Sequence, residues 1–121
     1  MRHSAICAST DPAATVEIIT GQGLTGGQSD VLLGSHVSQW NVNRSKTSRV
    51  PCKPLSALME SAGLHGADFI CLDVDGAEYR VLETVDLSKF KVVMVETCDD
   101  PSRNARVHQL LHREGLRLGC D

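Results

Sequence analysis

The chain has 121 residues, of which 41% are hydrophobic and 22% charged, as expected for one globular domain with a modest core. Its net charge of −3 excludes a strongly basic nucleic-acid surface, and no apolar run approaches the roughly 20 residues of a membrane span. The basic stretch Arg44–Lys53 is diluted by Ser, Thr and Pro, and we interpret it as a solvated loop. We therefore expect neither nucleic acid nor a membrane as a partner.

The cysteines bear on the compartment in which the protein works. They are Cys7, Cys52, Cys71, Cys98 and Cys120. Their number is odd and they contain no C-x-x-C pair, which argues against a zinc knuckle. The first residues carry positive charge but have no adequate apolar stretch behind them, so they do not form a convincing signal peptide. We expect reduced thiols in a cytoplasmic protein.

Two short strands are expected near the N-terminus. Residues 4–8 are apolar, and residues 15–20 are rich in β-branched side chains. Because Ser, Thr, Asp and Pro lie between them, a hairpin is plausible.

A long loop is expected after these strands, because residues 21–43 are rich in Gly, Ser, Gln and Asn. Within it, Gly21–Gly26 matches the spacing G-x-G-x-x-G of a dinucleotide-binding turn. Such a turn needs a helix at once and an acid roughly 20 residues later. The helix signal is poor, and no acid lies between Asp30 and Glu60. We interpret this segment as a flexible loop.

The second half alternates between helical and strand patterns. Apolar residues at helical spacing predict helices at residues 55–62 (ended by Gly63), 77–85 and from 101 to Gly115, and apolar runs predict strands at 67–74 and 92–95. This order is typical of an α/β fold with parallel strands joined by helices. The continuous apolar runs favour strands buried on both faces.

Acidic residues follow both predicted strands. Asp73 ends the first, Asp75 lies in the turn beside Gly76, and Glu96 ends the second. Because ligands bind outside the carboxyl ends of parallel strands, these acids fit a cationic or hydroxyl-bearing ligand, or a metal. The alternative is that acids end strands because the chain emerges into water. We interpret Glu78 as a first-turn acid that faces the positive end of its helix.

A histidine pair on the last predicted helix has a spacing that can hold zinc. His108 and His112 are separated by one helical turn. No third ligand of a suitable type is near them in the sequence, and both can lie on the solvent face.

From Val50 to Glu96 the sequence resembles the FkbM methyltransferase family. The segments that carry the resemblance are VPCKPLSAL from Val50, DFICLDVDGAE from Asp68, Val81-Leu82, and KVVMVE ending at Glu96. The family hallmark reads approximately D-[FL]-[IL]-x-[LI]-D-V-E-G-A-E, so this chain differs in having Asp75 for the usual Glu. More loosely, residues 4–6 resemble the end of the family's third strand and residues 15–20 its edge strand. Residues 1–121 are thus identified as a partial FkbM-type domain.

The resemblance implies a Rossmann-like class I methyltransferase sheet that uses S-adenosylmethionine, typically to methylate a hydroxyl oxygen of a small molecule. Asp73 and Asp75 are the implied catalytic residues. Ser4, Ala5, Asp73 and Glu96 are the implied cofactor-binding residues, and no metal is implied.

The same resemblance implies a truncated domain. The family's first two strands, with their glycine-rich turn and ribose-binding acid, would precede Met1, and further strands would follow Asp121. We therefore expect weak or no binding of S-adenosylmethionine by this chain alone, and an exposed sheet edge that favours self-association. Two alternatives remain: a non-catalytic remnant that acts as an interaction module, and a carboxylate–metal hydrolase using Asp73, Asp75 and Glu96. The lack of a histidine near these acids argues against the hydrolase.

Overall fold

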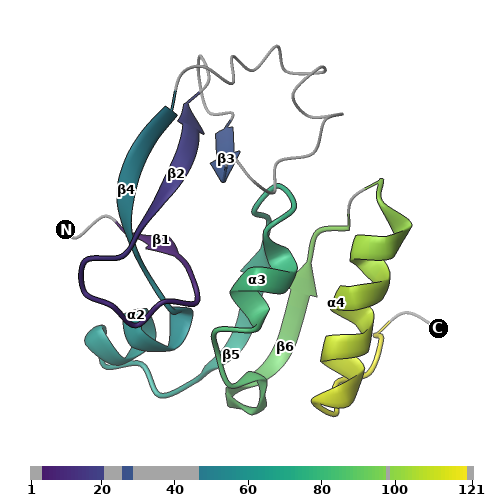
Figure 1. The fold of residues 1–121 in the computed structure, drawn as a ribbon. Coiled ribbons are helices and arrows are strands. Elements are labelled where there is room, and N and C mark those ends of the chain that lie inside the picture. Colours follow the sequence, from purple (N-terminus) through teal and green to yellow (C-terminus); the bar gives the residue numbers. More distant parts are fainter. Residues whose placement is uncertain (1–3, 21–25, 29–46, 98, 120–121) are drawn as a thin grey trace.

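The protein combines strands and helices in an α/β arrangement (Figure 1). The computed structural model describes residues 4–20, 26–28, 47–97 and 99–119. Among these residues, backbone hydrogen bonds define a four-stranded sheet and a two-stranded sheet. None of the described helices has the length and apolar character that crossing a bilayer demands.

The four-stranded sheet is mixed and has the order β1-β4-β2-β3. Its strands are β1 (Ala5–Ile6), β2 (Thr15–Thr20), β3 (Gly26–Gln28) and β4 (Thr47–Lys53). Strand β1 pairs in parallel with β4, whereas β2 is antiparallel to both β4 and β3.

This sheet bears on three predictions for the first half of the chain. The hairpin between the first two strands is wrong, because β4 lies between β1 and β2. The solvated loop is wrong for residues 47–53, which form β4. Most of the long loop, and the glycine-rich match up to residue 25, lie outside the described residues, but β3 lies within the predicted loop.

The two-stranded sheet confirms the predicted architecture of the second half. Strands β5 (Ala67–Leu72) and β6 (Phe90–Val95) are parallel neighbours, with Phe69 opposite Val92 and Leu72 opposite Val95. Between them lie helix α3 (Glu78–Leu82) and a short 3-10 helix, η1 (Leu87–Lys89). The chain thus forms a β-α-β unit with a helical crossover.

Two further helices end where the sequence predicts. Helix α2 (Leu55–Ser61) stops before Gly63, whose φ of 70° is readily adopted by glycine. Helix α4 (Pro101–Arg113) begins after Asp100, whose carboxylate accepts hydrogen bonds from the backbone amides of Ser102 and Arg103.

The core lies between the helices and one face of the β5–β6 sheet. Its buried residues come from all three helices, from both strands and from the connection after α3: Met59, Leu72, Val81, Leu82, Leu87, Phe90, Val107 and Leu110. The opposite face of the sheet is open. Phe69, Val92 and Met94 are each more than half exposed, and Cys71 is exposed beside them. The prediction of strands buried on both faces is therefore wrong among the described residues.

Two cysteines are joined. Cys7 and Cys52 form a disulfide, so the prediction of reduced thiols is wrong for this pair. Cys71 is a free, exposed thiol, whereas Cys98 and Cys120 lie outside the described residues.

Candidate functional site

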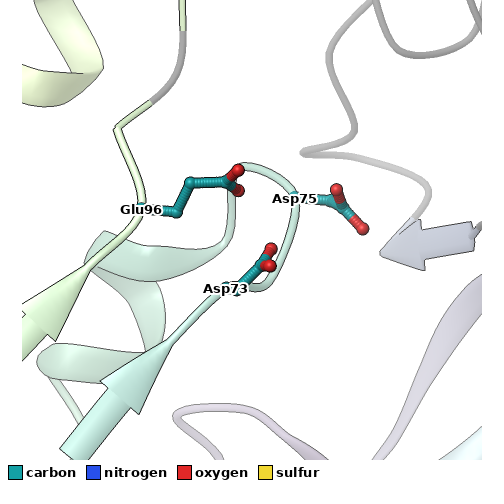
Figure 2. Close-up of side chains that lie close together, drawn as sticks. All are labelled: Asp73, Asp75 and Glu96. Carbon is teal, nitrogen blue, oxygen red and sulfur yellow. The ribbon is translucent and has the colours of Figure 1, made fainter.

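Three carboxylates meet at the carboxyl ends of β5 and β6 (Figure 2). Asp73 directly follows β5, and Glu96 directly follows β6. The Glu96 amide donates a hydrogen bond to the Leu72 carbonyl at 2.8 Å, which extends the parallel ladder by one step and sets Glu96 beside Asp73. Asp75 completes the group from the turn after β5, and one oxygen of each carboxylate lies within 4.8 Å of the others. The structure thus brings together the three acids that the sequence singled out.

The turn between β5 and α3 has an unusual backbone. Asp75 has a φ of 52° and Gly76 a φ of 102°. Asp enters the left-handed region more readily than most residues with a side chain, and Gly does so without a steric penalty. The pair Asp75-Gly76 therefore turns the chain sharply at the strand end and brings a carboxylate into the turn.

The buried carboxylate of Glu78 fastens this turn. Glu78 is only 6% exposed, and its Oε1 accepts hydrogen bonds from the backbone amides of Val74 at 3.2 Å and Gly76 at 3.1 Å. The sequence predicted Glu78 only as a first-turn acid, so its hydrogen bonds to the turn were not foreseen. Its spacing from the turn, two residues after Gly76, is the signal that could have indicated it, because a side chain at that distance can reach back to turn amides.

Negative charge accumulates at the strand ends. A hydrogen bond with Asp73 is the main cause that raises the pKa of the Glu96 carboxyl. Partial burial and the charges of Asp73, Asp75 and Glu78 raise this pKa further. The site therefore favours whatever neutralises it, which is a proton or a cationic or hydrogen-donating ligand.

A groove of about 270 Å³ opens beside the acids, between α3 and α4. Glu96 and Gly76 line it at the strand ends, so it adjoins the acid cluster. Arg103 reaches across from α4 and donates to the Gly76 carbonyl at 3.4 Å. Farther along, the Arg106 guanidinium lies 4.2 Å from the centre of the Tyr79 ring, a cation–π contact that joins the two helices.

The other candidates from the sequence lie elsewhere. Ser4 and Ala5 belong to the N-terminal edge of the four-stranded sheet, where the Ser4 hydroxyl donates to the carbonyls of Ala5 and Pro51. They are thus on a different sheet from the acids. His108 and His112 are exposed on α4, and the group of potential metal ligands found in the described part of the chain includes neither.

The acid cluster has the composition of a cation site. Three carboxylates offer hard oxygen ligands of the kind that Mg²⁺ and Ca²⁺ prefer. Asp73 and Glu96 are exposed and Asp75 is half-buried, so a ligand can reach them from solvent. The same oxygens can hold an ammonium group or accept hydrogen bonds from hydroxyls.

Comparison with known proteins bears on which of these ligands to expect. Residues 4–118 match the family model described as the methyltransferase FkbM domain. No curated protein and no solved structure matches the chain. The matched residues include the acid cluster, the turn that Glu78 holds and strand β1.

Proposed function

The chain belongs to the FkbM methyltransferase domain family, and we propose that it serves S-adenosylmethionine-dependent methylation of a hydroxyl on a small molecule. The observation that carries this proposal is the convergence of Asp73, Asp75 and Glu96 where two parallel strands end. We further propose that β5, α3, β6 and α4 form part of a Rossmann-like fold. The parallel pairing of β5 with β6 and the helical crossover between them support this proposal.

The residues of the site fit the donor in charge. S-adenosylmethionine supplies an electrophilic methyl group on a sulfonium, and it also carries an ammonium group and ribose hydroxyls. The raised pKa of Glu96 marks a concentration of negative charge that positive or hydrogen-donating groups would relieve. We assign Glu96 and Asp73 to these contacts, and we leave out Ser4 and Ala5 because they belong to the other sheet.

Asp73 is our proposed proton acceptor. Its carboxylate is exposed at the strand end and can accept a hydrogen bond from the acceptor hydroxyl, orient the oxygen and take its proton. Asp75 is the second candidate, because the turn places its carboxylate in the same cluster. The α3–α4 groove adjoins this cluster through Glu96 and Gly76, and we propose it as the path by which the acceptor approaches. Positioning and charge account for most of what an enzyme must supply to an in-line methyl transfer.

The test compares two carboxylate substitutions, one in β5 and one directly after it, in the protein at the full length that its gene encodes. Asp73→Asn removes the charge with little change of shape, and we expect methyl transfer to a panel of hydroxyl compounds to fall about 10²–10⁴-fold. Asp68→Asn is the matched control. Asp68 precedes the strand's apolar run, its side chain is 83% exposed, and it forms an ion pair with Lys91. We expect it to keep the parent rate.

Labelled methyl groups from S-adenosylmethionine provide the readout, and thermal melting of the same preparations shows whether each variant is folded. A folded Asp73→Asn protein that transfers methyl groups within a few-fold of the parent would show that Asp73 only ends its strand. Transfer to amines or thiols in place of hydroxyls would refute the proposed acceptor class.

An interaction module is the second candidate function. The open apolar face of the β5–β6 sheet favours it, since Phe69, Val92 and Met94 are 53%, 52% and 52% exposed. Its proposed occupant is a second copy of the chain, which would cover this face or extend a sheet edge. Sedimentation equilibrium should then show dimers that Phe69→Ser and Met94→Ser dissociate. A monomer at all concentrations would refute this candidate and leave the enzymatic proposal untouched.

A further inference from the structure

Strand β1 is the shortest strand of the four-stranded sheet. It contains two residues and lies at the edge of that sheet, where β4 is its partner strand among the described residues. Ala5 lies opposite Cys52 and Ile6 opposite Lys53, and the Cys7 amide donates to the Lys53 carbonyl at 3.0 Å. Such a short edge strand is marginal without another constraint, because each hydrogen bond contributes only about 1 kcal/mol net.

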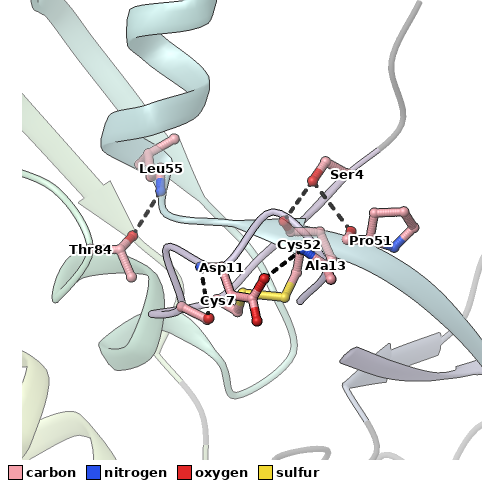
Figure 3. The surroundings of a disulfide bond; sticks show 10 residues. Ser4, Cys7, Asp11, Ala13, Pro51, Cys52, Leu55 and Thr84 are labelled. Atoms are coloured by element: carbon pink, nitrogen blue, oxygen red, sulfur yellow. Dashed lines mark hydrogen bonds between the residues drawn. A yellow bond between two sulfur atoms is a disulfide. The ribbon is translucent and has the colours of Figure 1, made fainter. Parts of the chain in front are cut away.

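The Cys7–Cys52 disulfide supplies that constraint (Figure 3). Cys7 immediately follows β1, and Cys52 lies in β4 with an exposure of only 3%. The two residues are 45 positions apart in the sequence, and their Cα atoms are 5.6 Å apart, within the usual range for a disulfide. The bond therefore closes a long loop, the case in which a crosslink restricts the unfolded chain most.

More depends on this bond than the strand alone. Ile6 packs against the main core, so holding β1 in the sheet also keeps Ile6 in contact with that core. The Cys52 amide donates to the Ala14 carbonyl at 3.0 Å, which ties the segment after β1 to the same point of β4. The bond thus joins β1 and β4 next to the residue that precedes β2, with its Cys52 side buried and its Cys7 side half-buried.

We propose that the folded domain is the oxidised form of this protein, with the Cys7–Cys52 disulfide holding β1 in the sheet. In its formation both thiols lose hydrogen and an Sγ–Sγ bond forms. The electrons and protons pass to a disulfide donor, such as a thiol–disulfide oxidoreductase or oxidised glutathione, which is reduced to two thiols. The protein then matures in a compartment where disulfides persist. Reduction releases β1 and withdraws Ile6 from the core.

The test joins mapping of the bond with two ways of removing it. After free thiols are blocked, peptide mapping of the purified protein should recover Cys7 linked to Cys52. Cys7→Ser and the parent treated with a reductant should both melt about 10 °C lower than the oxidised parent. Amides of residues 5–7 should exchange with deuterium at least about tenfold faster. Cys71→Ser is the matched control, because Cys71 is free and exposed, and it should leave both values unchanged.

These measurements separate the outcomes without requiring that the variant fold. If Cys7→Ser fails to fold while Cys71→Ser folds normally, the disulfide is required, and the reduced parent provides the exchange data. A blocked, unlinked Cys7 in the purified protein would overturn the proposal. So would a fully reduced parent whose melting temperature and β1 exchange match those of the oxidised protein. Methyl transfer is not a readout here, so failure of this proposal is distinguishable from failure of the proposed activity.

Discussion

Removal of the Glu78 carboxylate should destabilise the turn that presents Asp73 and Asp75. In Glu78→Ala the amides of Val74 and Gly76 lose their acceptor in a half-buried position. A buried donor left without a partner costs about 1–3 kcal/mol, and partial access of water reduces this cost. We therefore expect a loss of about 2–4 kcal/mol in the free energy of unfolding, a large part of the ~5–15 kcal/mol typical of a domain. The melting temperature should fall by about 8–15 °C.

Two companion variants make this prediction specific. Glu78→Gln keeps an oxygen that can accept from both amides, so it should lose only about 1 kcal/mol, the difference between a charged and a neutral acceptor. Glu83→Ala removes an exposed acid at the end of the same helix and should change stability by less than about 0.5 kcal/mol. Urea unfolding followed by circular dichroism measures all three. Equal stabilities of Glu78→Ala and Glu83→Ala would refute the role of Glu78 in holding the turn.

Two further perturbations test the packing and the charge of the β5–β6 unit. In Gly66→Ala the new Cβ would lie 2.7 Å from the Lys89 carbonyl oxygen, so the backbone must shift, and we expect the free energy of unfolding to fall by about 1–3 kcal/mol. In the control Gly119→Ala the new Cβ meets no atom within 4 Å, so this variant should keep the parent stability. Equal melting temperatures of the two variants would contradict the clash. The pKa of Glu96 is raised in the folded protein, so its contribution to stability is present below its ordinary value of 4.5 and is lost as the pH rises through the raised value. Glu96→Gln should therefore unfold at a higher urea concentration than the parent at pH 7, by a small margin because the side chain is exposed, and this advantage should disappear below pH 4.5; an advantage that grows on acidification would contradict the direction.

The second half of the fold was predictable because its signals are local. Apolar residues at helical spacing mark α2 and α4, and glycines follow each helix in the left-handed conformation, at Gly63 and Gly115. Two apolar runs on either side of a short helix can pair in parallel through that helix, and parallel pairing sets their carboxyl ends at one edge. The meeting of Asp73 with Glu96 follows directly from this topology.

The first two strands were predictable, but their arrangement was not, because it depends on contacts between distant segments. Residues 4–8 and 15–20 look like a hairpin by their spacing, yet β4, more than 25 residues later, separates β1 from β2. Spacing alone also could not pair Cys7 with Cys52, because five cysteines permit several pairings and the parallel register of β1 on β4 selects this one.

The misjudged burial of β5 and β6 has a physical cause that also bears on function. A strand buried on both faces needs a continuous run of apolar residues, but such a run does not by itself show that both faces are buried. In the structure Leu72 and Val93 face the helices, whereas Phe69 and Met94, on the opposite face, face outward. Exposed apolar side chains grouped on one face of a sheet are a candidate contact surface, and the interaction module proposed above rests on them. The acids at the strand ends need no such cover to be reached by a ligand. The two candidate functions therefore depend on different parts of the same strands, and variants of Phe69 and of Asp73 can test them separately.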